Sequence, residues 1–195
     1  GSIAGQQVYA AAHDGYTWLG DVAHTVSGWR TLGYADLGWE DFYGFYAASS
    51  PYVLFVSGNS PYQTAQQLFD AMRGDPSMKW GNAGLGSINQ LTGSLMLEKL
   101  GLKGNSVPYD GGRSAAIKVV AGEVTWSWCG LSDILDLAQS GDIRILGICD
   151  SSPREIDCAK GNYTVPSLLD DSPELNDLQG LLYWGFRVSR DTPAD

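Results

Sequence analysis

The chain has 195 residues, of which 12 are lysine or arginine and 22 are aspartate or glutamate, so its formal net charge is −10. An apolar share of 44%, with seven tryptophans and ten tyrosines, supplies a hydrophobic core and excludes a disordered chain. The acidic balance argues against a nucleic-acid partner, and no apolar run approaches the roughly 20 residues of a membrane span.

The first sixty residues predict a short amphipathic helix, a long polar and aromatic loop, and three strands. These elements are expected over residues 3–12 (helix), 16–19 (buried strand), 21–40 (loop), 43–48 and 52–57 (strands). The triplet His13-Asp14-Gly15 predicts the turn that ends the helix, because glycine adopts the left-handed conformation readily. Ser49-Ser50-Pro51 predicts a break between the last two strands.

From residue 60 onward, strands, glycine turns and helices alternate. Helices are expected over residues 64–72, 88–100, 113–121 and 132–139, with strands over 78–80, 105–109, 123–128, 143–149 and 181–188. In the second helix, Leu91, Leu95 and Leu100 lie near one face and predict its buried side. This alternation predicts an α/β sheet with helical crossovers.

The segment Gly84-Leu85-Gly86-Ser87-Ile88-Asn89 lies where a strand passes into a helix. Its glycines allow a tight turn and a close ligand, and the first helical amides lack partners within the helix. Because the helix dipole also places partial positive charge there, the segment favours binding of a carboxylate or phosphate. The alternative is that Ser87 only caps the helix. The segment matches neither a P-loop nor the dinucleotide fingerprint.

Val107-Pro108-Tyr109-Asp110-Gly111-Gly112-Arg113-Ser114 repeats the order of strand, glycines and helix start. Tyr109 offers a hydroxyl there. Arg113 places a cation near the positive end of a helix, which is locally unfavourable, so exposure to solvent is favoured over a role in a ligand cleft.

The strand Trp126-Ser127-Trp128 predicts both indoles on one face, where core packing is favoured over lining a cleft. Three cysteines follow, at Cys129, Cys149 and Cys158, without a C-x-x-C pair. A zinc site is therefore not expected. Cys149 and Cys158 either form a disulfide or remain free thiols.

Groups able to catalyse a reaction are few. The sequence has no Gly-x-Ser-x-Gly elbow, and its only imidazoles are His13 and His24. A small hydrolase using His24 and Ser87 is therefore a minor alternative, and the expectation is a protein that is not an enzyme.

Seven segments occur in the order found in the substrate-binding proteins of tripartite tricarboxylate transporters, the Bordetella-uptake-gene type. They are Asp14-Gly15-Tyr16-Thr17, Ser60-Pro61-Tyr62-Gln63-Thr64, Gly81-Asn82-Ala83-Gly84-Leu85-Gly86-Ser87, Val107-Pro108-Tyr109-Asp110-Gly111-Gly112, Ile145-Leu146-Gly147-Ile148, Thr164-Val165-Pro166-Ser167-Leu168, and Trp184-Gly185 with Asp191-Thr192-Pro193. His13 replaces the proline that precedes the first of them in the family.

The resemblance implies a two-lobed, type II periplasmic-binding-protein architecture, incomplete at both termini. Lobe 1 would comprise residues 1–57 and 169–195, and lobe 2 residues 58–168. Such a protein would be a periplasmic monomer that needs no cofactor. It would close on a small organic carboxylate and deliver it to permease subunits of the membrane transporter. The alternative function is that of a ligand-sensing partner, which would present the same closed form to a membrane sensor kinase.

The resemblance also implies the residues that contact the ligand. They are Gly84, Gly86, Ser87, Asn89, Tyr109, Gly112 and Cys129 in one lobe, with His24 and Thr25 in the other. Asn89 stands where the family commonly has histidine, and Cys129 where members often carry an acidic or polar residue that discriminates between substrates.

Overall fold

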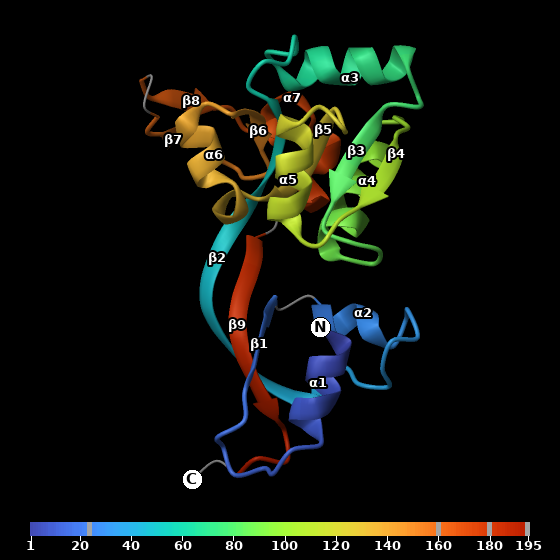
Figure 1. The fold of residues 1–195 in the computed structure, drawn as a ribbon, viewed down its shortest axis with the longest axis vertical. Coiled ribbons are helices and arrows are strands. Elements are labelled where there is room, and N and C mark those ends of the chain that lie inside the picture. The colour runs from blue at the N-terminus through green and yellow to red at the C-terminus, as the bar shows by residue number, and fades with distance from the viewer. Residues whose placement is uncertain (23–24, 159–160, 179–180, 194–195) are drawn as a thin grey trace. The chain divides into compact units, whose positions relative to one another are not determined.

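The computed structural model describes residues 1–22, 25–158, 161–178 and 181–193. They form two compact units (Figure 1). Unit 1 comprises Gly1–Ser50 and Leu182–Asp195, and unit 2 comprises Pro51–Leu181. The lobe boundaries given above describe parts that close on a ligand, and they stay a prediction.

Unit 1 is a small sheet with two helices. Its elements are α1 (Ser2–Tyr9), β1 (Leu19–Val22), α2 (Thr25–Trp29), the 3-10 turn η1 (Trp39–Asp41), the first part of β2 (Phe42–Ser57) and most of β9 (Leu181–Ser189). β1 pairs antiparallel with β9, from Leu19 opposite Arg187 to Val22 opposite Trp184. The core is centred on Trp29, whose indole leaves no room for a side chain at Gly5 of α1.

Unit 2 is the larger α/β unit. Its further elements are α3 (Ala65–Gly74), β3 (Lys79–Asn82), α4 (Ile88–Lys99), β4 (Asn105–Pro108), α5 (Gly112–Val120), β5 (Trp126–Gly130), η2 (Leu131–Asp133), α6 (Leu135–Ser140), β6 (Ile143–Ile148), β7 (Arg154–Ile156), β8 (Tyr163–Val165), α7 (Leu168–Asp171) and η3 (Pro173–Leu178). β3 is parallel to β4 and β5, whereas β2 runs antiparallel to β5 and β6. The predicted α/β class is confirmed.

Alternate residues of β5 face two different helices. Trp128 stacks on Tyr52 at 5.6 Å between ring centroids and donates from Nε1 to the Thr92 hydroxyl of α4 (2.9 Å). Trp126 stacks on Trp80 at 5.0 Å. Cys129 belongs instead to the core cluster that includes the buried side of α5. The two helices therefore cover opposite faces of the sheet, and they lie beside β3 and β5 in Figure 1. Core packing of both tryptophans is confirmed.

Two predictions in unit 1 are wrong. The strand expected over 16–19 begins at Leu19, where pairing with β9 starts, and Tyr16 is 89% exposed. The segment expected to be a loop over 21–40 contains α2, because Val26 and Trp29 lie one helical turn apart and are buried in the core of unit 1. The turn at Gly15 is confirmed, with φ +82°.

The break predicted at Ser49-Ser50-Pro51 does not occur, because β2 is one continuous strand of 16 residues. The ring of Pro51 fixes φ near −65°, a value that an extended chain accommodates. Pairing with β5 begins at the next residue, Tyr52 opposite Gly130. Pro51 thus lies where the strand passes between the two compact units.

The buried face predicted for α4 is also wrong. Leu91 and Leu95 are exposed, whereas Gly93, Met96 and Leu97 are buried. Gly93 directs this face inward, because a methyl group there would lie 2.8 Å from the Trp80 ring. The tryptophans of the sheet leave no room for a side chain at position 93, and the spacing of the leucines does not indicate this requirement.

This helix orientation predicts unequal costs for two neighbouring truncations. Met96→Ala should lower the free energy of unfolding by about 2–5 kcal/mol, because it leaves a cavity in a fully buried site. Leu95→Ala, 40% exposed in the wild type, should change it by less than about 0.5 kcal/mol. Urea unfolding of both variants measures the difference, and equal losses would contradict the orientation.

None of the helices that the structure describes combines the length and the apolar character needed to cross a membrane.

Candidate functional site

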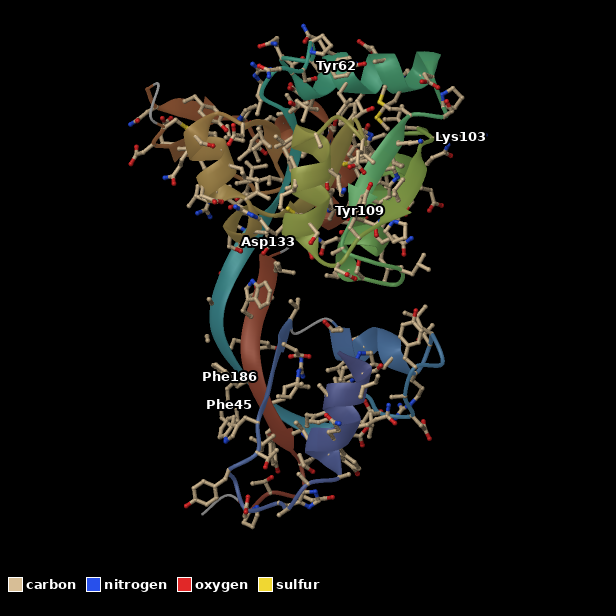
Figure 2. All side chains as sticks on the ribbon, viewed as in Figure 1. Phe45, Tyr62, Lys103, Tyr109, Asp133 and Phe186 are labelled. Atoms are coloured by element: carbon tan, nitrogen blue, oxygen red, sulfur yellow. The ribbon has the colours of Figure 1, made fainter. Side chains whose placement is uncertain are left out.

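Three loops of unit 2 leave the sheet at the same edge. They follow the carboxyl ends of β3, β4 and β5, and β3 is hydrogen-bonded in parallel to both of the other strands. Neighbouring parallel strands end on one side of a sheet, where α/β proteins bind ligands. Tyr109 and Asp133 belong to two of these loops (Figure 2).

The loop after β3 is held by its own side chains. Gly84 and Gly86 have φ of +116° and +70°, which confirms the need for glycine at both positions. The Gly84 amide donates to Oδ1 of Asn82 (3.0 Å), and the Gly86 amide donates to Oε1 of Gln90 (2.7 Å). The buried Asn82 amide group also donates to the Ser106 hydroxyl of β4 (2.7 Å), so the loop is fixed to the neighbouring strand.

Ser87 is the N-cap of α4, because its hydroxyl oxygen accepts from the Gln90 amide at 3.2 Å. The hydroxyl proton stays available for donation to another group. The amides of Ile88 and Asn89 belong to the first helical turn and have no acceptor within the helix. Together with the dipole of a 12-residue helix, these donors form a surface that suits an anionic oxygen.

The loop after β4 adjoins this first loop. The Tyr109 amide donates to the Asn82 carbonyl (2.9 Å), and a methyl group on Gly84 would lie 3.5 Å from the Tyr109 carbonyl oxygen. Gly111 has φ +93° and is the N-cap of α5, which begins at Gly112. The structure therefore brings five of the predicted residues, Gly84, Gly86, Ser87, Tyr109 and Gly112, to one edge of the sheet.

Two other predicted residues are buried and have partners within the protein. Asn89 is 5% exposed, and its Nδ2 donates to the Trp128 carbonyl at 3.4 Å. The thiol of Cys129 is fully buried and donates to the Gly130 carbonyl. Burial, reinforced by the charge of Asp133, raises the pKa of Cys129 well above its usual value. Contact of either residue with a ligand stays a prediction.

Asp133, in the loop after β5, was not identified from the sequence. A methyl group on Gly112 would lie 2.6 Å from its Oδ2 and 3.0 Å from Cβ of Cys129. Burial raises the pKa of the Asp133 carboxyl above its usual value. Its closeness to Gly112 joins segments 21 positions apart, which no local pattern indicates.

The structure does not show Arg113 or the two residues predicted from the other lobe within this group of side chains. Arg113 forms a bidentate ion pair with Asp136 on the exposed side of α5, which confirms the solvent-facing alternative. Thr25 is the first residue of α2 in unit 1. His24 lies outside the described residues.

A cavity of about 520 Å³ lies in unit 2, away from these three loops. It is lined by α3, β6, β8 and α7, with Phe69, Leu146 and Thr164 among its residues. No predicted ligand residue lines it. The cavity lining mixes apolar and polar side chains, including Arg144 and Asp171. The loops are the candidate site because the predicted ligand residues gather there, beside the amides at the start of α4 that have no acceptor within the helix.

The cysteines are free thiols. Cys149 donates to the Leu178 carbonyl (3.2 Å) and Cys158 to the Ala138 carbonyl (3.4 Å), so the disulfide alternative is not realised. Within the described ranges, no three acidic, histidine or cysteine side chains gather in a way that would hold a metal ion.

Comparison with known proteins gives a family match over most of the chain. The family model described as tripartite tricarboxylate transporter family receptor matches residues 1–156. A search of curated protein sequences finds no match.

Solved structures share the fold at low sequence identity. A periplasmic transporter structure superposes with a TM-score of 0.84 at 21% identity, covering 98% of this chain and 63% of its own. An R. palustris protein with adipate gives 0.82 at 22% identity, covering 100% and 64%. MatC from Rhodopseudomonas palustris, with bound malate, gives 0.77 at 19% identity, covering 98% and 64%. The periplasmic-binding-protein fold is confirmed, and the chain spans slightly less than two thirds of these relatives.

Proposed function

Because the chain belongs to the tripartite tricarboxylate transporter receptor family, we propose that it is a periplasmic solute-binding protein for a small organic carboxylate. It acts as a monomer and delivers the ligand to permease subunits of a tripartite tricarboxylate-type transporter. The observation that carries this proposal is the convergence of three loops at one sheet edge, beside the capped start of α4. Capture by closure of two lobes stays a prediction from the resemblance.

The chemistry at this edge suits a carboxylate without a formal cation. The nearest arginine along these loops, Arg113, is paired with Asp136. Negative oxygen is therefore stabilised by peptide amides at the start of α4 and by the Ser87 hydroxyl. Local donors are necessary, because a chain of net charge −10 repels anions at long range. The related structures that hold adipate and malate support the same ligand class.

We propose no catalytic step for this site. The Ser87 hydroxyl is engaged as a helix cap. Unit 2 also contains no histidine in its sequence, so a Ser87 nucleophile has no imidazole base within that unit.

Isothermal titration calorimetry with mono-, di- and tricarboxylates tests the proposal. Saturable heat with at least one carboxylate, and none with a neutral sugar, is expected. Binding of a sugar or a metal cation in the absence of any carboxylate binding would overturn it.

Ser87→Ala should weaken carboxylate binding by about 2–10-fold, the equivalent of roughly 0.5–1.5 kcal/mol for one lost hydrogen bond. The same substitution should lower stability by about 1 kcal/mol, because α4 loses its cap. Calorimetry and urea unfolding measure the two effects separately.

Thr64→Ala is the matched control. Thr64 caps α3 in the same way, with its hydroxyl oxygen accepting from the Gln67 amide at 3.2 Å, and it lies outside the three loops. This variant should lose similar stability and keep its affinity. If Ser87→Ala and Thr64→Ala lose carboxylate affinity equally, the lower affinity of Ser87→Ala is caused by its lower stability, and the assignment of Ser87 to the site is wrong.

A further inference from the structure

The loop that follows β5 places an unneutralised carboxylate beside the candidate ligand site. Asp133 lies against Gly112, the first residue of α5, and the neighbouring loop carries Tyr109 next to Gly84. These contacts connect Asp133 to the glycine loop at the start of α4. A ligand bound there by its carboxylate therefore has Asp133 at the same edge of the sheet.

No cation among the described residues pairs with this carboxylate. In the part of the chain that the structure describes, the Asp133 carboxylate forms no ion pair, because the Arg113 guanidinium is taken by Asp136 and meets Asp133 only at its carbonyl oxygen. The side chains on which Asp133 acts electrostatically are neutral acids, Cys129 and Tyr52. The Tyr52 hydroxyl is buried and makes no hydrogen bond with the residues described.

The carboxylate also changes what the start of α5 can bind. Its Oδ2 occupies the space next to Gly112, so the positive end of this helix already faces an acidic group of the protein. A second carboxylate of the ligand placed there would meet like charge at close range. The two helix N-termini therefore differ in what they can bind. The start of α4 has amides available for a ligand anion, whereas the start of α5 already has the carboxylate of Asp133 beside it.

We propose that Asp133 binds the ammonium group of the ligand, so that the site selects amino-carboxylates over the corresponding plain carboxylates. This inference rests on the proposed function, because it places the ligand carboxylate at the α4 start. An ammonium group supplies the missing positive charge and up to three donors for the carboxylate oxygens. The half-buried position makes such a pair stronger than one on the open surface.

Calorimetry with ligands that differ in one substituent tests the inference. Aspartate, malate and succinate carry an ammonium, a hydroxyl and a hydrogen on the same skeleton, and glutamate and glutarate form a second pair. The wild-type protein should bind the amino-carboxylate of each set about 10–100-fold more tightly than the plain carboxylate, as expected for one charged hydrogen bond. Equal affinities, or a preference for succinate or malate, would overturn the inference.

Asp133→Asn should reduce this preference to below about threefold, mainly by weakening aspartate and glutamate. Its melting temperature at pH 7 should equal or exceed that of the wild type, because a half-buried charge is removed, and this shows that the variant folds. Glu98→Gln removes a negative charge from the exposed surface near the end of α4, leaves the Arg113–Asp136 pair intact, and should keep the wild-type preference. An unchanged preference in Asp133→Asn would exclude Asp133 as the selecting residue.

Failure of the inference and failure of the proposed function give different results. If plain and amino-carboxylates bind with equal affinity, the receptor function stands and the role of Asp133 is rejected. If none of the five compounds nor any tricarboxylate binds, the proposed function is rejected, and the inference with it.

Discussion

Arg187→Met should lower the free energy of unfolding by about 3–5 kcal/mol, the cost of leaving a buried charge without its partner. In unit 1, Arg187 donates from Nε to Oδ1 of Asp21 at 3.0 Å, and the two side chains are only 7% and 8% exposed. The other carboxylate oxygen of Asp21 is buried without a hydrogen bond to the residues described. Methionine keeps most of the volume of the side chain and removes its charge.

The dependence of this loss on pH follows from the Asp21 carboxyl. Burial raises its pKa above the usual value even though Arg187 opposes the shift. Because the folded state favours the protonated acid, the stability contributed by this group is lost as the pH rises through the raised pKa. The difference between Arg187→Met and the wild type should therefore shrink toward acidic pH, where an uncharged Asp21 needs no partner.

Urea unfolding at several pH values measures this effect. The double variant Asp21→Asn with Arg187→Met should recover most of the loss, because neither charge remains. Arg30→Met is the control on the surface, where Arg30 pairs with exposed acids, and its urea midpoint should barely move. A double variant no more stable than Arg187→Met would contradict the account of the buried pair.

Trp128→Ala should cost about 3–5 kcal/mol of stability, the range for truncation of a large aromatic side chain in a core. The indole is fully buried, stacks on Tyr52 with an interplanar angle of 1°, and donates to the Thr92 hydroxyl. It therefore joins β2, β5 and α4. Trp128→Phe keeps the stacking surface and loses the hydrogen bond, so it should cost less, about 1–2 kcal/mol.

Thermal or urea unfolding gives the stability of both variants, and calorimetry gives carboxylate affinity where the variant is folded. A core role predicts that Trp128→Phe keeps wild-type affinity. A large loss of affinity with unchanged stability would instead make Trp128 a ligand-lining residue, which is the alternative that the strand pattern left open.

Local sequence signals predicted several elements well. Thr64 and Ser87 mark helix starts because a side-chain oxygen followed by helical spacing is a short-range property. The glycines of the β3 loop likewise predicted positive φ angles. What failed depended on distant partners. The buried face of α4 is chosen by the sheet tryptophans through Gly93, and the first residue of β1 by its pairing with β9.

The candidate site was only partly predictable for the same reason. The resemblance to the receptor family implied that Gly84, Gly86, Ser87, Tyr109 and Gly112 share one site, and the structure brings them to one edge of the sheet, where parallel strands end. Asp133 needed the packing of η2 against the start of α5, which the sheet order alone does not give. The sequence also left open whether Cys149 and Cys158 form a disulfide, because spacing along the chain does not give the distance between two side chains. In the folded protein each thiol donates to a different carbonyl.

The central claim is that peptide amides beside Ser87 hold a carboxylate, and amide-resolved NMR tests it most directly. Titration of the ¹⁵N-labelled protein with aspartate, malate and succinate should produce saturable shifts at residues 84–89 and 109–112. The amide signals of residues that line the separate cavity, such as Phe69, Leu146 and Thr164, should not shift. Saturable shifts confined to that cavity, with residues 84–89 unmoved, would contradict the account.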